Sequence, residues 1–168
     1  MGHSIRSGIF ACISCVRLKV FLRFELPALA AFTVSFLLST DWFAAHVTQS
    51  YLAWLFGWVA TEHTSERIRN SDFILRKVAH AVEYILLTWF LHRACRRSHP
   101  RAWSWPRACT VLVIMLLWAA SDEIHQTFTR YRYASVTDFF IDAGGVIAGL
   151  ALLYLRYHIF SRLRNAAI

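Results

Sequence analysis

Four long apolar stretches constrain the fold of this chain more than any other feature of its 168 residues. They lie at about Leu26–Ala44, Ile74–Cys95, Ala108–Phe128 and Val136–Tyr157, each close to the roughly 20 residues that a helix needs to cross a bilayer. A soluble protein with 57% hydrophobic residues would expose apolar patches that drive association, whereas a membrane solvates them. The sequence therefore predicts an all-α, polytopic helical membrane protein with about four transmembrane helices.

A fifth apolar stretch is too short to span the membrane. Val47–Ala60 holds 14 residues and is rich in aromatic side chains, which favours a short interfacial or re-entrant helix. A polar stretch, Thr61–Asp72, follows it. We expect three parts in the chain: a basic segment at 1–25, a transmembrane domain at 26–157 and a basic tail at 158–168.

The distribution of Lys and Arg predicts the orientation. If the N-terminus is inside, twelve of the 18 basic residues fall in inner segments and six in outer ones. The positive-inside bias therefore favours both termini in the cytoplasm and a multi-pass protein of the cell membrane. Basic residues before the first apolar stretch resemble a signal peptide, but both regions are long, which favours a retained signal anchor.

The net charge of +8 does not indicate a nucleic-acid partner. The basic residues flank apolar stretches rather than forming one patch, so anionic lipid head groups are the expected partners. The four cysteines all fall near the predicted inner side, where thiols stay reduced. Cys12 and Cys15 have the spacing of a metal or redox pair, but no second pair accompanies them, so free thiols are favoured.

Ionisable side chains inside the apolar stretches are costly and usually mark function or helix pairing. They are Arg76, Lys77, His80, Glu83 and Tyr84 in the second stretch, Asp122 and Glu123 in the third, beside the polar amide of Gln126, and Asp138 and Asp142 in the fourth. Because successive helices run in opposite directions, all three groups fall in the outer half of the membrane. At 1.5 Å per residue, Glu83, Asp122 and Asp142 lie roughly 6–12 Å below the outer boundary.

The fourth stretch also carries a GxxxG motif. Gly145 and Gly149 permit another helix to approach closely. Asp138 and Asp142 lie along the same stripe of the helix. The face predicted to contact its neighbour closely would therefore carry the acids into the bundle.

Three interpretations of this polar cluster stay open. The first is a network of ion pairs and hydrogen bonds that locks three helices together, since unpaired charges there cost several kcal/mol. The second is a pocket for an anionic head group, whose phosphate or carboxylate is bound by cations at the rim. These cations are Arg76, Lys77, Arg130 and Arg132.

The third interpretation is acid–base chemistry by His80 with Glu83 or Asp122, as in an intramembrane enzyme acting on an envelope lipid. A small proton-coupled transporter is a further alternative, which would need oligomers because four spans form only a thin pore. His80-x-x-Glu83 is a weak zinc signal without a nearby cysteine, so no metal or other cofactor is expected.

Two runs of residues resemble the motifs of VanZ-like membrane proteins. RKVAHAVEY, residues 76–84, resembles the family's RK-x-AH-x-x-EY. The second motif, DE-x-x-Q-x-F followed by R-x-x-S-x-x-D-x-x-x-[ND]-x-x-G-x-x-x-G, is matched by Asp122, Glu123, Gln126, Phe128, Arg132, Ser135, Asp138, Asp142, Gly145 and Gly149. Together the motifs cover about residues 73–150. Arg130-Tyr131 replaces the usual Pro-Gly, so the loop before Arg132 is expected to differ in shape.

This resemblance implies a helical integral membrane protein of the bacterial envelope, and the family's namesake is associated with low-level resistance to the glycopeptide teicoplanin. It implies no settled reaction. The expected function is binding of an anionic lipid or lipid-linked ligand at the outer leaflet. The expected partners are membrane lipids, a lipid-linked envelope precursor or a glycopeptide, and a second copy of the chain.

Overall fold

The computed structural model of the chain describes residues 17–40, 62–96, 103–128 and 135–166. A π-helical turn, η1 (Phe21–Glu25), leads into α2 (Leu26–Leu38), which is followed by α4 (Glu62–Arg96), α5 (Trp105–Gln126) and α6 (Val136–Ala166). No strand occurs in the described ranges, so the predicted all-α architecture is confirmed. The interfacial helix predicted at 47–60 and the segment at 1–16 lie outside the described residues.

Three helical segments are long and apolar enough to cross a membrane: Arg17–Leu38, Trp105–Gln126 and Val136–Leu163. α4 is long enough but less apolar, because side chains such as Lys77, His80 and Glu83 interrupt its apolar part. Its outward face is still apolar, with Ile74, Leu75, Val78, Val82 and Leu86 all exposed. Large apolar side chains exposed on every helix are the arrangement of a bundle that lipid surrounds.

Two helices extend beyond the predicted spans. α4 begins at Glu62 rather than near Ile74, and α6 continues to Ala166 rather than ending near Tyr157. Neither extension contains Gly or Pro, so no residue in it interrupts the helix. The polar stretch at 61–72 is thus helical from Glu62 onward.

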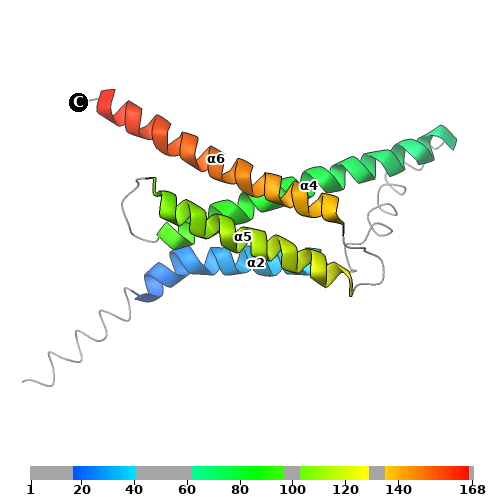
Figure 1. Cartoon of the computed structure of the whole chain (residues 1–168), viewed down its shortest axis with the longest axis horizontal. Helices are drawn as coiled ribbons and strands as arrows, with labels where there is room; N and C mark the ends of the chain where they lie inside the picture. Colours follow the sequence, from blue (N-terminus) through cyan, green and yellow to red (C-terminus); the bar gives the residue numbers. More distant parts are fainter. Residues whose placement is uncertain (1–16, 41–61, 97–102, 129–134, 167–168) are drawn as a thin grey trace, which may run out of the picture.

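Successive helices run in opposite directions, and α4 and α6 cross (Figure 1). The contact between α4 and α6 is the most extensive in the described chain, and α5 packs against both. Their shared core is small and consists of Tyr84, Leu87, Val111, Met115, Ala119 and Val146. The antiparallel order brings the C-terminal end of α5 and the N-terminal end of α6 to the same end of the bundle (Figure 1).

The α4–α6 contact is close at two glycines. A Cβ atom on Gly145 would lie 2.7 Å from the carbonyl oxygen of Ala81, and one on Gly149 would lie 3.0 Å from the Cβ of Thr88. Gly144, on the other side of α6, has nothing within 4 Å of the same position. The Gly145–Gly149 face therefore sets how near α6 comes to α4.

Candidate functional site

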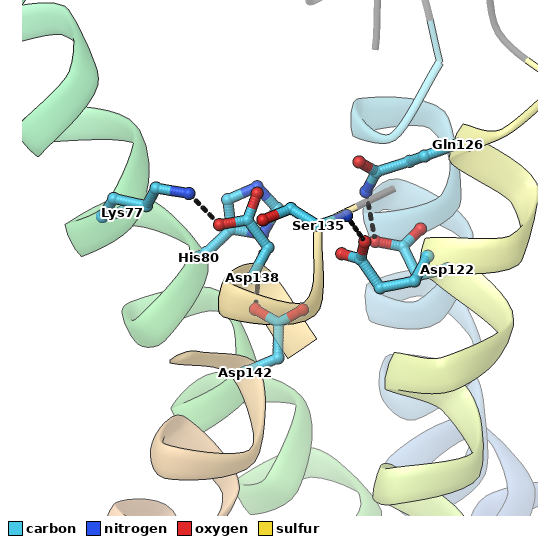
Figure 2. Close-up of polar contacts among 8 residues, drawn as sticks. Lys77, His80, Asp122, Gln126, Ser135, Asp138 and Asp142 are labelled. Atoms are coloured by element: carbon cyan, nitrogen blue, oxygen red, sulfur yellow. Dashed lines mark hydrogen bonds and ion pairs between the residues drawn. The ribbon is translucent and has the colours of Figure 1, made fainter. Parts of the chain in front are cut away.

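Polar side chains from three helices converge at one end of the bundle, and we call them the polar cluster. They are Lys77, His80, Glu83 and Tyr84 of α4, Asp122, Glu123 and Gln126 of α5, and Ser135, Asp138 and Asp142 at the start of α6. Figure 2 shows most of them pointing toward one another between the helices. α2 adds a further hydroxyl group, that of Ser35.

Lys77 and Asp138 form an ion pair that joins α4 to α6. Their side chains are 23% and 18% exposed, so the pair is partly shielded from its surroundings. The sequence predicted Lys77 as a cation at the rim of a pocket, and the structure shows that a carboxylate of the cluster contacts it directly. A ligand phosphate at Lys77 would therefore compete with Asp138.

His80 and Asp142 form a second contact between the same two helices. Nδ1 of His80 lies 3.4 Å from Oδ1 of Asp142, whose side chain is fully buried. The sequence analysis paired His80 with Glu83 or Asp122, but the structure pairs it with an acid on α6. Spacing along α4 places His80 and Glu83 on one face, but the crossing of α4 and α6 determines that Asp142 reaches the imidazole.

The acids of α5 fix the end of that helix and the start of α6. Gln126 Nε2 donates a hydrogen bond to Oδ2 of Asp122, at 3.1 Å. The backbone N–H of Ser135 donates to Oε2 of Glu123, at 2.6 Å. Glu123 thereby accepts from one of the backbone donors at the start of α6 that have no partner within the helix, an interaction that its negative charge favours.

Glu83 faces α2, where the sequence analysis assigned no site residue. Its carboxyl group forms a hydrogen bond with the hydroxyl of Ser35, which is buried. Ser35 and Ser39 are both buried and lie four residues apart, hence on one face of α2. Two serines at helical spacing in a largely apolar span are a signal that could have added α2 to the predicted cluster.

Several buried polar atoms of the cluster have no hydrogen-bond partner among the described residues. They include Oδ2 of Asp142, Oε1 of Glu123 and the hydroxyl of Tyr84. Such atoms are rare in proteins because each costs the free energy of its lost contacts with water. Carboxylate oxygens dominate this set, so the cluster is suited to accept hydrogen bonds from hydroxyl, amide or ammonium groups.

The remaining side chains that could take part in the site are placed as follows. Among the described residues, no group of three or more His, Cys, Asp or Glu side chains is arranged to hold a metal ion. The ring of His125 contacts Phe36 of α2, with 4.8 Å between ring centroids, instead of joining the acids. Arg76 is half-buried at the edge of the cluster, and Arg130 and Arg132 lie outside the described residues.

The comparisons with known proteins agree with the motifs in the sequence. Searches of curated proteins and of solved structures each return no match. The family model described as VanZ/LLP1 matches residues 24–158, which include all four apolar stretches and the whole polar cluster. This protein therefore belongs to the VanZ/LLP1 family.

Proposed function

We propose that the polar cluster binds the head group of a lipid-linked ligand at the outer leaflet of the cell membrane. The observation that carries this proposal is the set of buried carboxylate oxygens, on Asp142 and Glu123, without partners among the described residues. A purely structural network would satisfy its acceptors internally, since unsatisfied buried groups are costly. Hydroxyl or amide groups of a ligand would supply the missing donors.

Cations complete the proposed site at its rim. Lys77 lies beside the acids, and Arg76 precedes it on α4. Arg132, which precedes α6 in the sequence, is part of the motif shared with VanZ-like proteins. Guanidinium and ammonium groups bind phosphate well, so a phosphate at the rim and a sugar or peptide group below it would fit this order of charges.

The proposal depends on the orientation, which the excess of basic residues in inner segments supports. Cys95 and Cys109 are exposed near the end of the bundle away from the cluster. A membrane-impermeant maleimide added to intact cells is expected to leave both thiols unlabelled until the membrane is permeabilised. Val136→Cys, at the exposed start of α6, should be labelled in intact cells. Labelling of Cys95 before permeabilisation would place the cluster in the inner half.

Binding of three lipids to the purified full chain tests the proposed function. The probes are phosphatidylcholine, a polyprenyl phosphate and a polyprenyl-phosphate sugar. We expect the protein to prefer the last, and Glu123→Gln to weaken that binding by about tenfold, the effect of one lost hydrogen bond to a charged group. The Gln side chain can still accept from Ser135, so the helix end is retained. Arg132→Ala should weaken binding of both phosphates.

A control variant and three outcomes decide the experiment. Glu25→Gln removes the carboxylate at the end of η1, away from the cluster, and should bind like the wild type. Equal binding of all three lipids, or no effect of both Glu123→Gln and Arg132→Ala, would refute the proposal. Cleavage of the sugar lipid that Asp142→Asn abolishes would instead make the cluster an active site, with His80 as the base that Asp142 orients.

Teicoplanin resistance, which is associated with the family's namesake, would be an indirect consequence of such binding. A protein that binds a lipid-linked envelope ligand changes how much of that ligand is accessible at the outer surface. Such a protein is expected to alter the response of cells to antibiotics that act there.

A further inference from the structure

A cavity of about 450 Å³ lies between α4 and α6 at the end of the bundle opposite the polar cluster. Its walls combine cationic, aromatic and hydroxyl-bearing side chains. The lining residues are Trp89, His92, Arg93, Arg96, Leu153, Arg156, Tyr157, Phe160 and Ser161. Lys77 and Arg93 are sixteen residues apart on α4, or about 24 Å along the helix, so the cavity is separate from the cluster.

Aromatic rings position two of the three arginines that line this cavity. The guanidinium of Arg93 lies 5.5 Å from the ring centroid of Phe24 and 5.7 Å from that of Trp89. That of Arg156 lies 5.8 Å from the ring of Phe160. Cation–π contacts orient a guanidinium but do not neutralise its charge. None of the lining residues is acidic and three are arginines, so the lining itself carries a net positive charge.

His92 provides an independent indication of a ligand. Its side chain lines the cavity and is 1% exposed, yet Nε2 has no hydrogen-bond partner among the described residues. Stacking on Trp103, with 5.9 Å between centroids, fixes the orientation of the imidazole ring. Together with the hydroxyls of Tyr157 and Ser161, His92 offers hydrogen bonds to a group that the arginines attract.

We propose that this cavity binds the phosphate of an anionic membrane lipid in the inner leaflet. Three guanidinium groups around one cavity match the charge and the several acceptor oxygens of a phosphate. The apolar walls favour a lipid over a free anion: Leu153 is buried, and Phe160, Leu155 and Ile159 lead outward along α6 with more than half of each side chain exposed. Acyl chains can follow this apolar face while the head group lies among the arginines.

Lipid binding to the purified full chain in a neutral detergent tests this site. The probe is phosphatidylglycerol, compared with phosphatidylcholine, and bound lipid is counted by native mass spectrometry. The wild type should prefer phosphatidylglycerol. Arg93→Gln with Arg156→Gln should lower its apparent affinity by about 25-fold, from about fivefold for each arginine. Arg17→Gln with Arg162→Gln removes the same charge from exposed positions outside the cavity and should cause little change.

Further arms separate the possible outcomes. Inorganic phosphate at a concentration matching the lipid should compete poorly, and effective competition would identify a free-anion site instead. If the Arg93/Arg156 variant does not fold, Ser161→Trp fills the cavity without changing charge and should also reduce phosphatidylglycerol binding. Equal losses in the cavity and control variants would show a diffuse charge effect and overturn the proposal. The proposal would also be overturned if the Arg93→Gln/Arg156→Gln variant and the Ser161→Trp variant both folded and bound phosphatidylglycerol with wild-type affinity.

Discussion

Gly145→Ala is expected to destabilise the protein by about 1–3 kcal/mol, the usual cost of inserting a methyl group into a tightly packed contact. The new Cβ would lie 2.7 Å from the carbonyl oxygen of Ala81, which belongs to the backbone of α4 and cannot rotate away. α6 would have to move outward. Because Asp138 and Asp142 are on the same stripe, this movement would also separate them from Lys77 and His80.

Gly144→Ala is the matched control for this prediction. It makes the same chemical change one residue away, where a Cβ meets nothing within 4 Å. Alanine favours helix over glycine by up to about 1 kcal/mol, so this variant should be as stable as the wild type or more so. The midpoints of thermal unfolding in detergent should differ by several degrees between the two variants. Equal midpoints would mean that the two helices are not fixed by this contact.

Gly149 provides a graded comparison within the same experiment. Its added Cβ would lie 3.0 Å from the Cβ and 3.2 Å from Cγ2 of Thr88, both side-chain atoms. The backbone of α4 fixes the Cβ of Thr88, as it does the Cα of Ile85 at 3.3 Å, but these distances are longer than the 2.7 Å at Gly145. α6 would have to move less, so Gly149→Ala should destabilise less than Gly145→Ala. Gly145→Ala should also disturb the polar cluster more than Gly149→Ala, because Gly145 is less than one turn from Asp142 and Gly149 lies one turn farther away.

The sequence was sufficient to predict that the polar residues converge, but not which of their side chains contact each other. Helical spacing and alternating direction bring Glu83, Asp122 and Asp142 to one end of the bundle, since both follow from the rise of a helix and the length of the spans. Which acid contacts His80 depends on the crossing of α4 and α6, and spacing within one helix contains no information on it. Pairing with Asp142 therefore emerged only from the structure.

The contribution of α2, and the cavity at the end of the bundle opposite the polar cluster, were missed for a different reason. Serine is tolerated in apolar helices, so Ser35 gave a weak signal beside the charged residues. The arginines near the ends of α4 and α6 were counted only as indicators of orientation. Their placement around one cavity depends on Arg93 and Arg156, sixty-three residues apart, meeting across the α4–α6 contact.

Reversing both charges of the Lys77–Asp138 pair is expected to restore much of the stability that either single reversal removes. Lys77→Asp places two carboxylates in contact, and Asp138→Lys places two ammonium groups in contact, at positions less than a quarter exposed. Each single variant should unfold at a much lower temperature or fail to accumulate, because uncompensated partly buried charges cost several kcal/mol. In the double variant the pair is re-formed with opposite polarity. If the double variant were no more stable than the single ones, the contact would not be an ion pair that joins α4 to α6.

Lys77→Met with Asp138→Asn then separates the structural role of this pair from ligand binding. It removes both charges at similar volume, a change that is often close to neutral for stability when a buried pair is replaced. If the pair only joins the helices, this variant should fold and bind the polyprenyl-phosphate sugar like the wild type. If Lys77 also contacts the ligand phosphate, the variant should fold but bind about tenfold more weakly, the effect of a lost charge-assisted hydrogen bond. Asp138→Asn alone makes the distinction sharper. It removes the carboxylate that competes with the phosphate for Lys77, so a ligand-binding Lys77 predicts tighter binding despite lower stability.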